Sequence, residues 1–181
     1  MIPQHPVRLR CRIPGSVSIK GSDDRYYNNL FVGNGEALTS DRKGNLKELR
    51  WISSFGLWGY DGRELPLQTG GNVYYRAAEP YAREAGPTVL AGTDPKVKLV
   101  QQGDRFILQI SPGPGLKQVG TVLVTTGTLG LAKTPNLPYE TADGAPLKVD
   151  TDYFGKQRSK TKPAAGPFEH PGEGDLRIEV W

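Results

Sequence analysis

Glycine and proline interrupt this chain so often that no long element of regular structure fits between them. Of its 181 residues, 23 are glycine and 15 are proline. Glycine readily adopts turn conformations that strain other residues, and proline cannot donate a main-chain hydrogen bond, so both residues end helices and strands. The chain therefore has to fold from short elements joined by many turns.

Strand-like runs dominate what lies between these turns. Residues 7–13 alternate apolar and basic side chains, and residues 26–32 are rich in aromatic and branched side chains. Both patterns are typical of β-strands. Further strands are expected at 72–75, 97–100, 105–110, 119–125, 147–149 and 176–181. This spacing predicts an all-β protein whose later strands form an antiparallel module.

One segment has the pattern of a helix. Asn45 can cap its start, and Glu48 follows at the spacing of a capping box. Gly56 can end the helix. The apolar residues that recur at helical spacing in between are Leu46, Leu49, Ile52 and Phe55. The sequence thus predicts one short helix at 45–55.

Composition also suggests how the chain is divided. Residues 81–95 are rich in proline, glycine, alanine and threonine, which favours a linker or long loop. We therefore expect a first part at 1–80 that holds the early strands and the inserted helix. The antiparallel module then occupies 96–181.

Several kinds of site are excluded by what the sequence lacks. The only cysteine is Cys11, and the only histidines are His5 and His170, which rules out disulfide frameworks, Cys/His zinc sites and most histidine-centred triads. Asp150–Gly155 resembles the start of a calcium loop, but Thr161 stands where the final acidic ligand is needed. We expect no metal and no cofactor.

Charge and hydropathy exclude two classes of partner. The net charge of +4 comes from 23 basic and 19 acidic residues that are mostly interspersed. The densest basic run, at 156–162, contains no aromatic residue on which a base could stack, so a nucleic-acid partner is not expected. No window approaches the roughly 18 apolar residues that cross a membrane. The first twenty residues contain no signal peptide, and we expect that the chain begins inside a longer one.

Two pairs of segments resemble a known family. Gly21–Gly33 and Leu65–Tyr75 resemble the last turns of secreted bacterial right-handed parallel β-helix proteins of the glycoside hydrolase and polysaccharide lyase type. Asp152–Arg158 and Ala165–Glu169 resemble the Asp-x-x-Gly-x-x-Arg…Gly-x-[Phe/Tyr]-Glu ending that is common behind such helices.

The resemblance implies a fold and a function. Residues 1–80 would be the last rungs of the β-helix, with Asn29 and Asn72 stacked in an amide ladder at the bends. The antiparallel module would cap the open end of the solenoid. The chain would then be the C-terminal part of an extracellular or periplasmic glycoside hydrolase acting on a polysaccharide, with its upstream β-helix region missing. The alternative is a non-catalytic carbohydrate-binding or structural capping module.

The candidate catalytic residues are Asp23, Asp24 and Arg25. Glycosidases use a pair of carboxylates, and neighbouring strand residues point to opposite faces, so one aspartate would need a partner from elsewhere. The candidate partners near in sequence are Glu36, Asp41, Asp61 and Glu64. In the alternative interpretation, one aspartate caps a turn or pairs with Arg25. Because no second carboxylate is evident, we expect the chain alone to show little or no glycosidase activity.

Aromatic residues suggest where a sugar would bind. Sugar rings stack on flat aromatic side chains, and most of the aromatic residues lie between 26 and 81. Tyr26, Trp58 and Tyr60 are the candidate substrate-binding residues, the last two because they lie in a glycine-rich loop. Packing in the core is the alternative.

The ending motif carries a further expectation. If this segment packs against the module, Asp152 or Glu169 should pair with Arg158, whose planar guanidinium binds a carboxylate through two hydrogen bonds. Alternatively, Arg158 and its lysine neighbours bind an acidic glycan.

Overall fold

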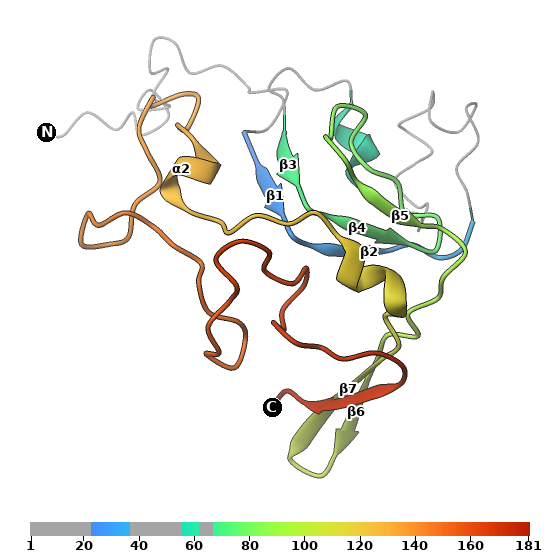
Figure 1. Cartoon of the computed structure of the whole chain (residues 1–181). Helices are drawn as coiled ribbons and strands as arrows, with labels where there is room; N and C mark the ends of the chain where they lie inside the picture. The colour runs from blue at the N-terminus through green and yellow to red at the C-terminus, as the bar shows by residue number, and fades with distance from the viewer. Residues whose placement is uncertain (1–22, 37–55, 62–66) are drawn as a thin grey trace, which may run out of the picture.

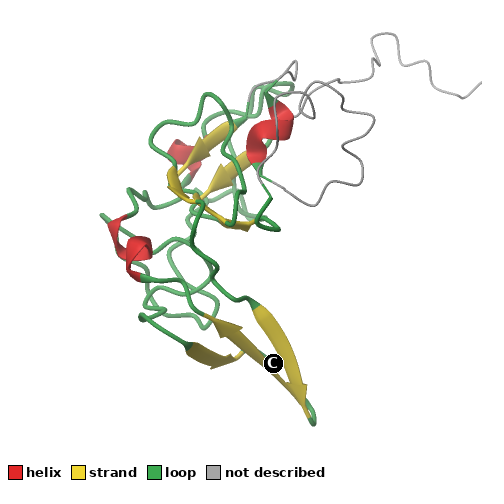
Figure 2. Cartoon of the chain, turned by 90° about the vertical axis from the view of Figure 1, so that its right-hand side faces the viewer, coloured by secondary structure: helices red, strands yellow, loops and turns green. Residues whose placement is uncertain are grey.

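The computed structural model describes residues 23–36, 56–61 and 67–181. Two lobes follow one another along the molecule, one with parallel and one with antiparallel strands (Figures 1 and 2). The predicted helix at 45–55 and the predicted strand at 7–13 lie outside the described residues. No helix in the described ranges is long and apolar enough to cross a membrane.

The first lobe repeats one strand–bend–strand unit. Strands β1 (Arg25–Tyr27) and β2 (Leu30–Val32) pair in parallel with β3 (Gln68–Gly70) and β4 (Val73–Tyr75), respectively. Arg25 lies opposite Gln68 and Leu30 opposite Val73, so both pairs have the same offset along the chain. Two strand–bend–strand units therefore lie side by side, and each such unit is called a coil below.

A left-handed residue makes the bend in each coil. Asn28 has a φ of 58° and Gly71 a φ of +65°, and the two occupy equivalent positions. Asparagine and glycine are the residues that adopt this conformation most readily. The predicted single strand at 26–32 is wrong in this respect, because Asn28 divides it into β1 and β2.

The segment expected as a linker also contributes to the first lobe. Strand β5 (Thr88–Leu90) pairs in parallel with β4, which makes a three-stranded sheet in the order β2-β4-β5. Tyr81 and Glu84 are buried. The segment is thus packed against the parallel strands, and the division of the chain into domains stays a prediction.

The second lobe holds an antiparallel sheet of β6 (Lys98–Gln102), β7 (Arg105–Ile110) and β8 (Leu176–Glu179). Gly103, with a φ of +62°, lies in the tight turn between β6 and β7. The regular structure is mostly β, as predicted, but each described sheet has only two or three strands.

The connection between β7 and β8 differs from the prediction. The expected strands at 119–125 and 147–149 meet only through the isolated bridge between Thr125 and Lys148. The reason is local: Thr125 caps the short helix α2 (Thr126–Leu129), and its hydroxyl accepts a hydrogen bond from the Thr128 N–H at 3.2 Å. The other described helical segments are the 3₁₀ turns η2 (Leu57–Tyr60) and η3 (Pro114–Gln118).

The core lies on both faces of β4, whose three residues are fully buried. Tyr74 packs on one face, and the other members of that cluster are Leu57, Leu67, Ala78 and Tyr81. Val73 and Tyr75 pack on the opposite face with Leu116, Val119 and Ala165. Residues from the loop-rich connection thus cover one face of the parallel strands.

Candidate functional site

Asp23 and Arg25 lie at the start of β1 and hold a distant loop. The Arg25 side chain is only 6% exposed and pairs with the Asp23 carboxylate. Its Nε and Nη2 donate to the carbonyls of Leu129 and Leu131 at 3.1 and 2.7 Å. Its guanidinium also lies over the Tyr139 ring. The pairing of Asp23 with Arg25 is the geometry that the alternative interpretation of this cluster expected.

The surroundings of Asp23 keep its carboxyl ionised. Burial raises its pKa, but the Lys133 backbone N–H, which donates at 2.5 Å, and the Arg25 guanidinium together lower that pKa below its usual value. An ionised carboxylate can act as a base or nucleophile, whereas a general acid must carry a proton. Asp24 is half-buried, and its carbonyl accepts a hydrogen bond from the Gln68 N–H. The catalytic role of these residues stays a prediction.

Two of the four candidate carboxylate partners, Glu36 and Asp61, lie within the described residues. Asp61 accepts a hydrogen bond from the Ala82 N–H at 2.8 Å. The Glu36 carboxylate accepts a hydrogen bond from the side-chain amide of Asn34 at 3.4 Å. Asp41 and Glu64 lie outside the described residues.

Two of the three candidate sugar-binding residues meet. The hydroxyls of Tyr26 and Tyr60 are 3.1 Å apart, within hydrogen-bond distance, and their rings are 6.0 Å apart. Trp58 shares the turn η2 with Tyr60 and is half-buried. The predicted glycine-rich loop is thus a 3₁₀ turn, because Leu57 anchors it in the core.

The raised pKa of Tyr26 should make the free energy of unfolding fall at high pH. The hydrogen bond with Tyr60, together with burial, raises the pKa of Tyr26 from 10.0 to about 12. Because the folded state keeps this proton longer than the unfolded state, its contribution is fully present below pH 10 and lost as the pH rises through 12. Tyr26→Phe should flatten that decline, as measured by urea unfolding across this range. Tyr153→Phe, at an exposed position, is the control. An equally steep decline in Tyr26→Phe would contradict the assignment.

A buried polar chain runs through the stacked bends. Asn72 Oδ1 accepts from the Asn29 Nδ2 at 3.1 Å, which confirms the expected asparagine stacking. Asn72 Nδ2 donates to Glu84 Oε1 at 2.8 Å, and the Tyr74 hydroxyl donates to Glu84 Oε2 at 2.5 Å. Burial and the hydrogen bond to Glu84 raise the pKa of Tyr74. Sequence reasoning missed Glu84, since it lies in the segment interpreted as a linker.

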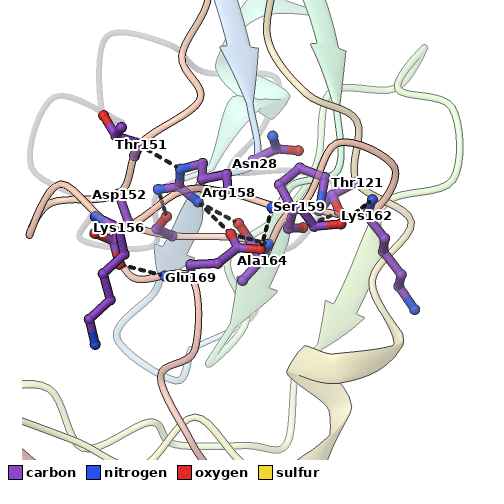
Figure 3. Close-up of polar contacts among 12 residues, drawn as sticks. Asn28, Thr121, Thr151, Asp152, Lys156, Arg158, Ser159, Lys162, Ala164 and Glu169 are labelled. Carbon is purple, nitrogen blue, oxygen red and sulfur yellow. Dashed lines mark hydrogen bonds and ion pairs between the residues drawn. The ribbon is translucent and has the colours of Figure 1, made fainter.

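The ending motif folds around Arg158 and Glu169, and residues 151–169, held together by these two side chains, are called the clamp below (Figure 3). Arg158 donates to three carbonyls, those of Thr151, Ala164 and Gly166, at 3.1, 3.0 and 2.9 Å. Its Nη1 lies 3.5 Å from the Glu169 carboxylate, which confirms the expected acid–arginine pair as an ion pair. The two expected hydrogen bonds to the carboxylate are not formed, because the guanidinium donates to the three carbonyls. The Arg158 and Glu169 side chains are 11% and 3% exposed. The Arg158 guanidinium therefore stabilises the loop, and little of its surface is accessible to a ligand.

Two carboxylates hold the backbone of this clamp. Glu169 accepts hydrogen bonds from the N–H groups of Ser159 and Ala164 at 2.8 and 3.0 Å. Asp152 accepts from the N–H groups of Glu169, Phe154 and Lys156. The hydrogen bond from the Glu169 N–H lowers the pKa of Asp152 most, and those from Lys156 and Phe154 lower it further, although burial raises it. Asp152 thus stabilises a turn.

Two cavities border this part of the molecule. One, of about 480 Å³, lies along residues 26–31 of the first coil. The other, of about 610 Å³, lies between η3 and residues 159–172. In the described ranges, no three acidic, histidine or cysteine side chains are grouped so as to hold a metal ion.

These features define a β protein in which parallel strand–bend–strand coils adjoin a loop-rich antiparallel lobe. The chain is similar to a solved structure described as the complex structure of XylC with xylose, with a TM-score of 0.67 and 25% sequence identity. The similarity covers 88% of this chain and 26% of that chain, so this chain spans about a quarter of that protein's length. No protein-family model matches the chain, and no curated protein matches it either.

Proposed function

We propose that this chain is the C-terminal part of a right-handed parallel β-helix protein that acts on a polysaccharide as a glycoside hydrolase. The similarity to XylC in complex with xylose carries this proposal, since it extends over 88% of the chain. The parallel coils with equivalent bends and the Asn29–Asn72 ladder support the β-helical fold. Parallel strand connections are almost always right-handed, which supports the handedness.

The proposal places a further β-helix coil beside the first described one. In the described part of the chain, β1 and β2 each pair along one edge only, with β3 and β4. The cavity of about 480 Å³ is lined by residues 26–31 and by the connection between β7 and β8, including Leu123, Val149 and Pro167. The Asn72 side-chain oxygen accepts hydrogen bonds from Asn29, and an earlier coil would donate to Asn29 in the same way. We infer that a preceding β-helix coil covers the other edge of β1 and β2.

In this proposal the sugar lies near the start of β1. Asp23, Asp24 and Arg25 supply charge there, with Asp23 held as an ionised carboxylate. Tyr26, Trp58 and Tyr60 supply aromatic surfaces for stacking. A second carboxylate would come from the region upstream.

The second candidate is a non-catalytic carbohydrate-binding or capping module. It is favoured by Arg25, whose guanidinium donates to the carbonyls of Leu129 and Leu131 and lies over the Tyr139 ring, and so fastens the loop at 129–139. The two candidates differ at Asp24. In a hydrolase its carboxylate lies against the sugar, so Asp24→Asn should change the affinity for xylan. In a capping module that substitution should leave the affinity unchanged.

Affinity electrophoresis of the whole chain tests the carbohydrate function. Gels containing xylan should retard the chain, and Tyr60→Ala should weaken binding about tenfold, because a lost stacking contact is worth about 1.4 kcal/mol. Tyr153→Ala, which changes an exposed tyrosine outside this cluster, is the control. If xylan, arabinan and pectin all fail to retard the chain, the carbohydrate function is wrong.

Hydrolysis of an aryl xyloside tests whether the chain is a complete enzyme. The proposal expects little or no turnover by the chain alone, because its second carboxylate is supplied from upstream. Turnover that Asp23→Ala or Asp24→Ala abolishes would show that the chain contains a complete active site.

A further inference from the structure

The larger cavity has apolar walls and a polar rim. It has a volume of about 610 Å³, within the range of small-molecule sites. Leu116, Val119 and Ala165 line it and are buried parts of the core. Lys117, Ser159, Lys162 and His170 also line it. These polar groups come from η3 and from the loop that the Arg158 clamp holds in place.

Among the described residues that line this cavity, one lysine has no carboxylate partner. Lys117 Nζ lies 2.8 Å from the Glu173 carboxylate. The carboxylate of Glu169 is neutralised by Arg158. Lys162 is exposed and pairs with no carboxylate among the described residues. The cavity therefore carries one uncompensated positive charge, which matches a ligand with a single negative charge.

The rim also offers hydrogen bonds suited to hydroxyl groups. Ser159 Oγ accepts the Lys162 N–H at 3.1 Å, which leaves the hydroxyl hydrogen free to donate outward. His170 is exposed at the opposite end of the lining segment and adds an imidazole. A ligand with an apolar face, several hydroxyls and one carboxylate would match all of these groups.

We propose that this cavity binds an acidic sugar, a pyranose that bears a carboxylate, with the carboxylate against Lys162. The C–H face of the ring packs against Leu116 and the half-buried Pro171, and its hydroxyls contact Ser159 and His170. This site deepens the proposed carbohydrate function and rests on it. It also moves the acidic-glycan site expected at Arg158 to Lys162, since the Arg158 guanidinium is already occupied by three carbonyls.

The test uses two ligands that differ only at one carbon. Methyl β-D-glucuronide carries the carboxylate, and methyl β-D-glucoside carries a neutral CH₂OH group in its place. Titration of the whole chain, followed by NMR or calorimetry, should show the glucuronide binding at least tenfold more tightly. Its affinity should fall as salt is added, because the ion pair lies at the rim.

Two lysine variants locate the site. Lys162→Met keeps most of the length of the side chain but removes the charge, so the preference for the glucuronide should be lost while the melting temperature stays the same. Lys160→Met, in the same loop but outside the cavity lining, should bind like the parent chain. Equal affinity for both sugars, or equal losses in both variants, would overturn the proposal.

The outcome is separable from that of the proposed function. Retardation by xylan depends on Tyr60 and is measured with a neutral backbone, whereas glucuronide binding depends on Lys162. Xylan binding without glucuronide preference would remove only the acidic-sugar site. Glucuronide binding without retardation by any polysaccharide would remove only the proposed function.

Discussion

Asn72→Ala is expected to lower the free energy of unfolding by about 3 to 5 kcal/mol. The Asn72 side chain is fully buried. Its oxygen accepts from the Asn29 N–H at 2.9 Å, and its nitrogen donates to the Tyr26 carbonyl and to Glu84, both at 2.8 Å. Alanine would leave these groups without partners, and each unsatisfied buried group costs about 1 to 3 kcal/mol. Urea unfolding followed by tryptophan fluorescence measures the change.

Two further variants test the explanation. Asn29→Ala removes contacts at a half-buried position and should cost about 1 to 2 kcal/mol. Asn72→Asp keeps the shape but places a second carboxylate beside Glu84, so its loss of stability should shrink as the pH falls and the carboxyl is protonated. Costs below about 1 kcal/mol in both Asn72 variants would show that the ladder contributes little.

Most of the strands could be predicted because their signals are local. Residues 105–110 are rich in aromatic and branched side chains and are followed by turn residues, and the structure places β7 at those positions. The bend at Asn28 was harder to predict, because a left-handed asparagine inside an aromatic run has no distinct local pattern. Its equivalence to Gly71 becomes visible only once the coils are stacked.

Tertiary contacts determine the features that sequence reasoning missed. Residues 81–95 have the composition of a loop, but β5 pairs there with β4, and Glu84 ends the buried polar chain. Around Thr125, the capping hydrogen bond of α2 outweighs the strand propensity of the residues before it. Neither outcome follows from hydrophobic periodicity alone.

The candidate site was predictable in its residue types but not in its geometry. The charged cluster at 23–25 was compatible with catalysis and with an ion pair, and the Asp23–Arg25 pair became clear only with the carbonyls of Leu129 and Leu131 in place. Those partners lie more than a hundred residues away in the chain. The pair of Arg158 with Glu169 was easier to expect, because both residues lie within one short motif.

Arg158→Ala is expected to cost about 3 to 5 kcal/mol of unfolding free energy, because removing one partner of a buried ion pair leaves an uncompensated charge. Glu169 would remain buried, and the carbonyls of Thr151, Ala164 and Gly166 would lose their donor. Arg158→Lys should recover only part of this loss, since an ammonium group cannot reproduce the planar arrangement of donors. Thermal and urea unfolding measure both variants.

The matched control is Arg105→Ala, because Arg105 pairs with Glu179 at a similar distance of 3.4 Å but is 65% exposed. Such an exposed pair should contribute less than about 1 kcal/mol. Repeating the melts with oligogalacturonate separates the clamp from a ligand site at Arg158. The clamp requires Arg158→Ala to melt at a lower temperature with and without the glycan. An unchanged melting temperature together with lost glycan affinity would instead assign Arg158 to binding, and the structural role proposed for it would be wrong.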